Sequence, residues 1–181
     1  MPIHSLVKRW LPDDTERLTF KPWGKRALNA LALPGRFMYP EFGRLPPNHL
    51  RCRVAAGARP PWRNEIIFIW RAYNLWLFFF GKGLANLESD VLEIGCGCGR
   101  NAHALSQINV LNETFTGHYL GVDIDEEAIA WCQKNFAPEQ FQFARSPHRS
   151  NFYKNSGGEE NAVTIPLEAE SRDFVFSNAV F

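Results

Sequence analysis

The sequence lacks three things: a long uninterrupted apolar run, a substantial net charge and a regular cysteine pattern. Its 181 residues include only four cysteines, and Cys96 and Cys98 stand too close together in a glycine run to form a disulfide with each other. No second cysteine pair follows at zinc spacing, so we expect reduced thiols and no metal site. The first residues hold no apolar stretch of signal-peptide length, and we expect a cytoplasmic protein.

The formal net charge is only +1, but the charges are unevenly distributed. Residues 1–65 contain 12 Lys and Arg against 5 Asp and Glu, whereas residues 66–181 contain 8 against 14. Such a basic segment can bind an anionic substrate, a nucleic acid or a membrane surface, or it can pair with the acidic part of its own chain. No nucleic-acid-binding module is recognisable, which argues against a nucleic-acid partner.

Residues 1–61 are expected to form an irregular, basic N-terminal arm. Prolines recur throughout this segment and exclude long helices. Short helices are predicted around residues 13–19 and 24–32, the second of them ending at Pro34-Gly35. For the stretch that follows we expect an extended chain; it reads PEFGRLPPNHLRCRVAAGARPPW.

Residues 62–85 predict an apolar helix that leads into the next domain. Within residues 66–80 the only strongly polar side chains are Arg71 and Asn74. This stretch is shorter than the roughly 20 apolar residues of a membrane span, and an arginine near its middle is costly in lipid. We therefore expect a helix packed against the following domain. The alternative is an interfacial helix in peripheral contact with a membrane.

Residues 86–181 show predicted strands in alternation with predicted helices. This alternation is typical of a parallel sheet in a doubly wound α/β domain. Asp125 is a good N-cap for one of the helices, and two glutamates follow it in the first turn. The expected strands are 90–94, 119–123, 141–144 and 172–177, and the expected helices are 99–107 and 125–135.

A glycine-rich turn carries the strongest functional signal. Residues 91–100 read VLEIGCGCGR, with a predicted strand before the glycines and a predicted helix after them. Glycines at such a place allow a sharp turn and the close approach of a ligand to the backbone. Glu93 precedes the first glycine by two residues, and Asp123 ends the second strand, where an acid can hold a ribose diol. Both acids together favour a bound nucleotide-like ligand over a bare turn.

The glycine spacing distinguishes between two nucleotide-like ligands. A dinucleotide fingerprint, Gly-x-Gly-x-x-Gly, would place its last glycine where Arg100 stands. A carboxylate at Glu93 would repel a pyrophosphate, but it suits a ligand that carries an ammonium and a sulfonium. These features favour S-adenosylmethionine over NAD.

Three segments together resemble the class I S-adenosylmethionine-dependent methyltransferases, most closely small bacterial members of the small-molecule or glycan type. They are VLEIGCGCGR, YLGVDIDEEAIAWCQKNF and RDFVFSNAVF, and the resemblance covers about residues 85–181. It implies a Rossmann-like sheet and the transfer of a methyl group (EC 2.1.1.-) to a small-molecule, glycan or lipid-linked acceptor. The alternative is a noncatalytic protein that keeps the fold for binding.

The resemblance also implies where the cofactor would bind. The acid and the glycine turn would line its methionine end, the end of the second strand would hold its ribose and adenine, and the segment after the fourth strand would lie near the methyl group. The residues of these three groups, in the same order, are Glu93, Gly95, Cys96, Gly97 and Gly99; Asp123 and Ile124; and Asn178. No catalytic base is implied.

Two features depart from the family pattern. The acid that often binds the adenine amino group after the third strand is replaced by Pro147, with Ser146 and His148 on either side. The family fold continues through three more strands beyond the position of Phe181. On this comparison we expect a truncated domain that is inactive by itself.

Overall fold

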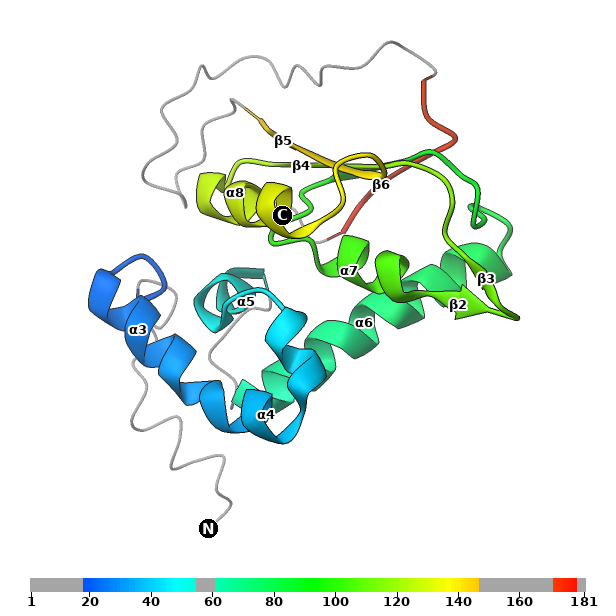
Figure 1. Ribbon diagram of the computed structural model, residues 1–181. Coiled ribbons are helices and arrows are strands. Elements are labelled where there is room, and N and C mark those ends of the chain that lie inside the picture. The colour runs from blue at the N-terminus through cyan, green and yellow to red at the C-terminus, as the bar shows by residue number, and fades with distance from the viewer. Residues whose placement is uncertain (1–17, 55–60, 147–170, 179–181) are drawn as a thin grey trace. The chain divides into compact units, whose positions relative to one another are not determined.

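The computed structural model describes residues 18–54, 61–146 and 171–178 (Figure 1). The chain divides into two compact units, Met1–Phe68 and Ile69–Phe181. This division lies inside a helix, whereas the sequence suggested boundaries at residues 61 and 85. The two units are described separately below.

The first unit consists of short helices. The predicted helix at 24–32 is present, and the one at 13–19 lies outside the described residues. The helix predicted at 24–32 ends at Leu31, before Pro34-Gly35, but an unpredicted short helix then contains this pair; the expectation of an extended stretch around residue 50 is wrong, because it is helical. Proline is tolerated in the first turn of a helix, where its missing N–H has no partner to lose. The elements are α3 (Pro22–Leu31), α4 (Leu33–Met38), the 3₁₀ helix η1 (Pro40–Arg44) and α5 (Asn48–Val54).

Polar side chains of α5 are buried in the first unit. Asn48 donates from Nδ2 to the carbonyl oxygen of Leu28 at 2.7 Å. Arg51 donates from Nη2 to Oε1 of Glu65 at 2.8 Å, and both side chains are fully buried. Part of the excess positive charge is therefore neutralised within this unit.

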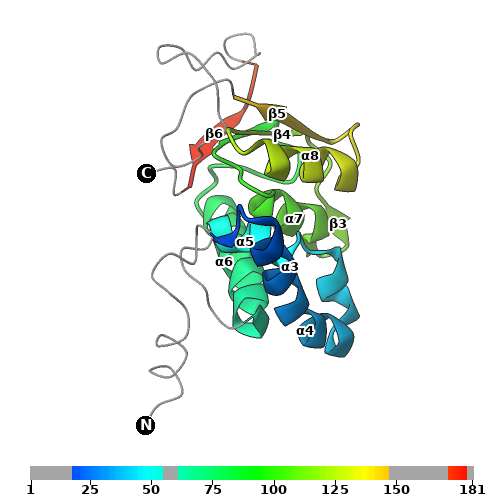
Figure 2. The same cartoon turned by 90° about the vertical axis from the view of Figure 1, so that its left-hand side faces the viewer.

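The second unit is built on a four-stranded parallel sheet in the order β5-β4-β1-β6 (Figure 2). All four strands lie where the sequence predicted them, which confirms the Rossmann-like α/β class. A short antiparallel hairpin, which the sequence did not predict, joins the helix predicted at 99–107 to the second strand of the sheet. The strands of the sheet are β1 (Val91–Ile94), β4 (Tyr119–Asp123), β5 (Phe141–Arg145) and β6 (Phe174–Ser177); the hairpin strands are β2 (Asn109–Val110) and β3 (Glu113–Thr114).

Three helices pack on one face of this sheet (Figure 1). They are α6 (Pro61–Gly81, from residue 69 onward in this unit), α7 (Arg100–Gln107) and α8 (Glu126–Asn135). The rings of Trp76 and Phe79 lie 5.6 and 5.1 Å from that of Phe176 in β6, so the expected packing of the apolar helix on the domain is confirmed. No helix among the described residues is long and apolar enough to cross a membrane.

Gly121 of β4 is required by the packing beneath the glycine turn. A Cβ at this position would lie 2.8 Å from Sγ of Cys96 and 2.9 Å from the ring of Phe143. Gly121→Ala should therefore lower the free energy of unfolding by about 1–3 kcal/mol, measured by urea denaturation. Gly43→Ala is the control, since a Cβ at Gly43 meets nothing within 4 Å. Equal stability of the two variants would contradict this account of the packing.

Candidate functional site

The predicted site residues lie along the edge of the sheet where the parallel strands end. From β1 the chain crosses to β4 and β5 on one side and returns to β6 on the other side. The order therefore reverses between β1 and β6, and ligands of open α/β sheets bind outside the carboxyl ends of the strands at such a point. The glycine turn, Asp123 and Asn178 all follow strand ends at this edge.

The turn between β1 and α7 needs its three glycines. Gly95, Gly97 and Gly99 have φ angles of 81°, 55° and 73°, in the left-handed region that other residues rarely adopt. Gly99 is also tightly enclosed, since a Cβ there would lie 3.0 Å from Sγ of Cys132. Gly99 is the N-cap of α7, so the alternating glycines set the path of the chain from the strand into the helix.

Asp123 connects the end of β4 to the glycine turn. Its Oδ2 accepts a hydrogen bond from the backbone N–H of Gly97 at 2.6 Å, and its Oδ1 accepts one from the N–H of Asp125 at 2.8 Å. Burial raises the pKa of Asp123, and these backbone N–H groups oppose that rise. A carboxylate has about four lone-pair sites, so the half-buried Asp123 can accept a further hydrogen bond beside those from the backbone.

Glu93 lies below the turn rather than at its surface. Only 2% of the residue is exposed. Oε1 accepts a hydrogen bond from Nδ2 of Asn101 at 2.6 Å, and Oε2 accepts one from the hydroxyl of Tyr119. Burial raises the pKa of Glu93 to about 7, although both hydrogen bonds favour the ionised form. Glu93 therefore has the geometry of a residue that positions the turn from within.

The partners of Glu93 extend to the helices on this face of the sheet. The indole N–H of the fully buried Trp76 donates to the carbonyl oxygen of Asn101 at 2.8 Å, which ties α6 to the start of α7. The positive charge of the neighbouring Arg100 favours the ionised form of Glu93. Neither Asn101 nor Tyr119 was a predicted site residue. Tyr119 and Glu93 lie on one face of the sheet because Val91 pairs with Tyr119, and alternation within each strand does not reveal this register.

The other predicted site residues occupy different surroundings. The thiol of Cys96 is buried and packs over Gly121, so only the backbone of Cys96 is placed to meet a cofactor. Ile124 and Asn178 are half-buried, and Asn178 directly follows Ser177, which pairs with Ile94 at the end of β1. Ser146 is buried, and its N–H donates to the carbonyl oxygen of Asp123 at 2.8 Å. The positions 147 and 148 lie outside the described residues.

These groups fit the cofactor that the sequence predicted. Asp123 offers unused lone pairs at the level where a ribose diol would bind, and the turn beside it has no Cβ at three positions. No cluster of three His, Cys, Asp or Glu side chains that could hold an ion occurs among the described residues. A carboxylate at such an edge suits a polar, uncharged diol.

The raised pKa of Glu93 predicts a specific pH dependence of stability. Because the folded-state pKa of about 7 exceeds the ordinary 4.5, the folded state binds more protons in that window, and its unfolding free energy falls as pH rises through it. The substitution Glu93→Gln removes this fall in the unfolding free energy, because glutamine does not titrate. The stability of the variant relative to wild type should rise by on the order of 2–3 kcal/mol between pH 4.5 and 7, measured by urea denaturation.

Tyr119→Phe serves as the second variant in this experiment. It removes a hydrogen bond to the carboxylate, so the upper end of the pH window should move to higher pH. A constant stability difference between Glu93→Gln and wild type across this pH range would show that burial does not perturb Glu93.

Comparisons with known proteins agree with this geometry. The family model described as "Methyltransferase domain" matches residues 92–181. An uncharacterized protein of Haemophilus influenzae (strain ATCC 51907 / DSM 11121 / KW20 / Rd) is 30% identical over 105 residues, which are 58% of this chain and 35% of that protein. The chain thus spans about a third of the length of this curated relative.

Among solved structures, a chain of magnesium protoporphyrin IX methyltransferase (ChlM) from Synechocystis PCC 6803 with bound SAH matches with a TM-score of 0.37 and 19% identity. The match covers 61% of this chain and 48% of that one. The family match coincides with the sheet, the glycine turn and Asp123. Residues 92–181 are a methyltransferase domain, which confirms the predicted resemblance to the class I S-adenosylmethionine-dependent methyltransferases.

Proposed function

We propose that this protein binds S-adenosylmethionine at the carboxyl edge of the sheet and transfers its methyl group to an acceptor. The observation that carries the proposal is the bond between Asp123 and the N–H of Gly97, which holds the glycine turn beside the end of β4. The family match over the same residues supports it. The reaction class is that of methyltransferases, EC 2.1.1.-.

The ribose of the cofactor would bind to Asp123. The carboxylate could accept a hydrogen bond from the ribose diol while it keeps its backbone N–H donors, because these donors do not use all of its lone-pair sites. Ile124 would contact the adenine ring from the adjacent position. Ser146, whose N–H bonds to the carbonyl oxygen of Asp123, is the described residue best placed to approach the adenine in the absence of an acid at residue 147.

The methionine end of the cofactor would lie along the glycine turn. Gly95, Gly97 and Gly99 allow the ligand to approach the backbone, and Glu93 would act from below the turn as a positioning residue. Its buried carboxylate lowers the local electrostatic potential where an ammonium and a sulfonium would bind. Asn178 would border the methyl group from the end of β6.

When bound, S-adenosylmethionine would supply an electrophilic methyl group for in-line transfer to the acceptor atom. For such a displacement, fixed alignment of the reactants supplies much of the rate acceleration, up to about 7–11 kcal/mol. The chain's own contribution is the rigid turn that orients the cofactor. We propose a small-molecule, glycan or lipid-linked acceptor, following the members of the family that the sequence resembles.

Asp123→Ala tests the ribose assignment. Losing a charge-assisted hydrogen bond costs about 1–3 kcal/mol, so the variant should bind S-adenosylmethionine roughly 5- to 150-fold more weakly by isothermal titration calorimetry. Glu139→Ala, which removes an exposed acid from the same unit, should bind like wild type. Urea denaturation of both variants separates a binding defect from a folding defect.

The competing dinucleotide hypothesis is tested in the same experiment. NAD should produce no binding heat with wild type, because the turn lacks the third fingerprint glycine and Glu93 lies beneath it. Equal affinity of wild type and Asp123→Ala for S-adenosylmethionine, or binding of NAD instead, would refute the assignment.

A further inference from the structure

The first unit exposes apolar side chains that its own core does not use. Four of them lie between the end of α3 and the end of α4, and we call them the α3–α4 surface: Leu31, Leu33, Phe37 and Met38, exposed by 53%, 61%, 91% and 63%. Single exposed apolar residues are ordinary in soluble proteins, but a run of them marks an interaction site.

Other residues of the same helices, and of the junction between them, already supply the packing of the unit. Leu28, Ala32 and Gly35 are buried, and the carbonyl oxygen of Leu28 accepts the hydrogen bond from Asn48. Within α4, Leu33 and Phe37 are four residues apart and therefore share one side of the helix. The α3–α4 surface is thus an amphipathic arrangement whose apolar side is directed outward.

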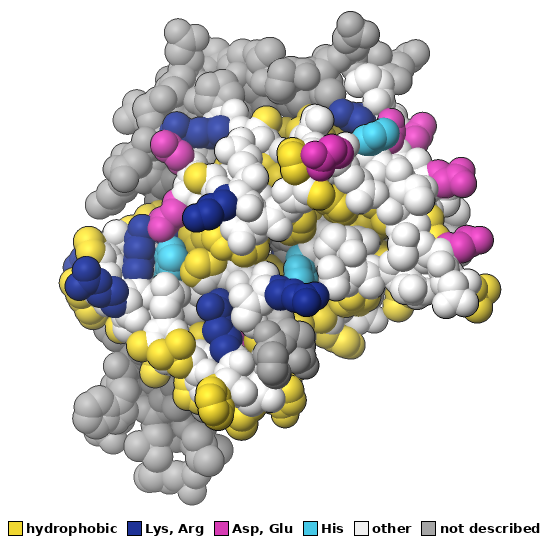
Figure 3. Space-filling view, in the orientation of Figure 1, with side chains coloured by type: hydrophobic (Ala, Val, Ile, Leu, Met, Phe, Trp, Pro, Cys, Tyr) yellow, Lys and Arg dark blue, Asp and Glu magenta, His cyan; other side chains and the backbone are white. Residues whose placement is uncertain are grey.

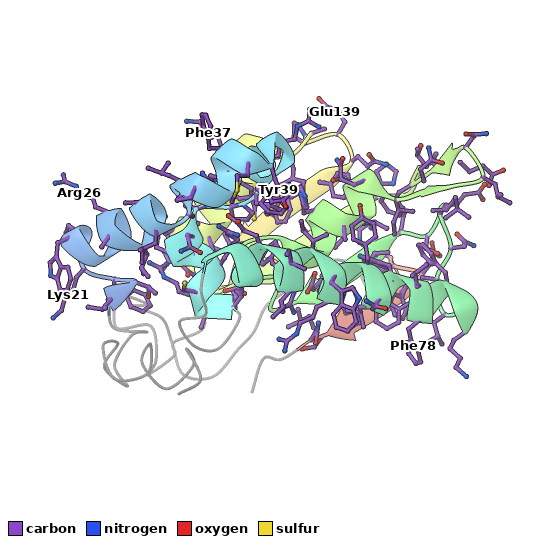
Figure 4. All side chains as sticks on the ribbon, turned by 90° about the horizontal axis from the view of Figure 1, so that it is seen from below. Lys21, Arg26, Phe37, Tyr39, Phe78 and Glu139 are labelled. Atoms are coloured by element: carbon purple, nitrogen blue, oxygen red, sulfur yellow. The ribbon has the colours of Figure 1, made fainter. Side chains whose placement is uncertain are left out.

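Basic residues accompany this apolar surface. Residues 18–54 contain seven Lys and Arg but a single acid, Glu41; two of the seven cations are buried, and the other five are exposed or half-buried. Figure 3 shows hydrophobic side chains over α3 and α4 with Lys and Arg beside them. In Figure 4, Phe37 projects away from α4, and Lys21 and Arg26 extend outward from the start and middle of α3. Trp23, which is 60% exposed, lies between these two cations in the sequence.

We propose that the α3–α4 surface binds the surface of a lipid bilayer that contains anionic phospholipids. Helices that lie in the membrane interface combine Trp, Phe and Leu on one side with Lys and Arg beside them, and they bind by apolar burial together with attraction to anionic headgroups. A nucleic acid would use the cations but would leave Phe37 and Met38 without a role, because phosphate contacts are polar. The excess of cations over acids within residues 18–54 fits anionic lipid by charge complementarity.

The exposed side of α6 is the competing surface. Trp70, Leu77 and Phe78 are 64%, 60% and 53% exposed there, and the sequence pointed to this helix for peripheral membrane contact. Residues 69–82, which include the helix from residue 69 and the residue that follows it, contain only two basic residues, Arg71 and Lys82. We assign membrane binding to the α3–α4 surface because positive charge is denser there.

Vesicle co-sedimentation of the full 181-residue chain tests the proposal. Wild type should sediment with vesicles of phosphatidylcholine mixed with phosphatidylglycerol, more weakly with phosphatidylcholine alone, and less as salt is raised. Phe37→Ser combined with Met38→Ser should weaken the partition at least roughly tenfold, because two large apolar side chains are lost from the contact. Lys21→Gln with Arg26→Gln should remove most of the preference for the anionic vesicles.

Matched controls come from the second unit. Leu111→Ser removes a side chain that is 92% exposed in the β2–β3 turn, and Lys134→Gln removes an exposed cation; both should sediment like wild type. Leu77→Ser with Phe78→Ser tests α6, and circular dichroism verifies the fold of each variant. The proposal is overturned if wild type does not bind the anionic vesicles, or if the Phe37 and Met38 double variant binds them as wild type does, whatever the α6 variant does.

Discussion

The hydrogen bond from the N–H of Gly97 to Asp123 is the interaction on which the candidate site depends. Three glycines in the left-handed region make a turn that has no preferred shape of its own, because glycine is conformationally permissive. The carboxylate at the end of β4 fixes that turn against the sheet and, through the N–H of Asp125, also meets the start of α8. One side chain therefore organises the edge where two crossovers of the sheet diverge.

A second constraint acts from below the turn. A carboxylate buried as deeply as Glu93 is costly unless its oxygens are hydrogen-bonded, and Asn101 and Tyr119 meet that need. Because Asn101 also accepts the indole N–H of Trp76, the same network joins β1, β4, α6 and α7. The acid that the glycine motif contributes is thus part of the domain core, and we propose that it would act on a cofactor by electrostatics and by positioning the turn.

Much of the second unit could be predicted from the sequence because its signals are local. The strand ends, the glycine turn and the Asp125 cap, which accepts from the N–H groups of Glu127 and Ala128, all follow from residue type and spacing. The partners of Glu93 and the inward thiol of Cys96 could not be predicted from the sequence. They depend on the strand register and on the exact path of a left-handed turn. In the first unit, α4 and α5 were missed because proline was treated only as a helix breaker, whereas at Pro34 it occupies the first turn of a helix.

The account's central claim is that S-adenosylmethionine binds on the glycine turn and the end of β4. Amide hydrogen–deuterium exchange of the full chain, measured with and without S-adenosylmethionine, tests this claim directly, because a ligand slows exchange where it restricts local opening. The account predicts slower exchange in residues 94–101 and 123–128, with little change in α3 and α4. Unchanged exchange in these two segments at saturating S-adenosylmethionine, or protection confined to the first unit, would contradict it.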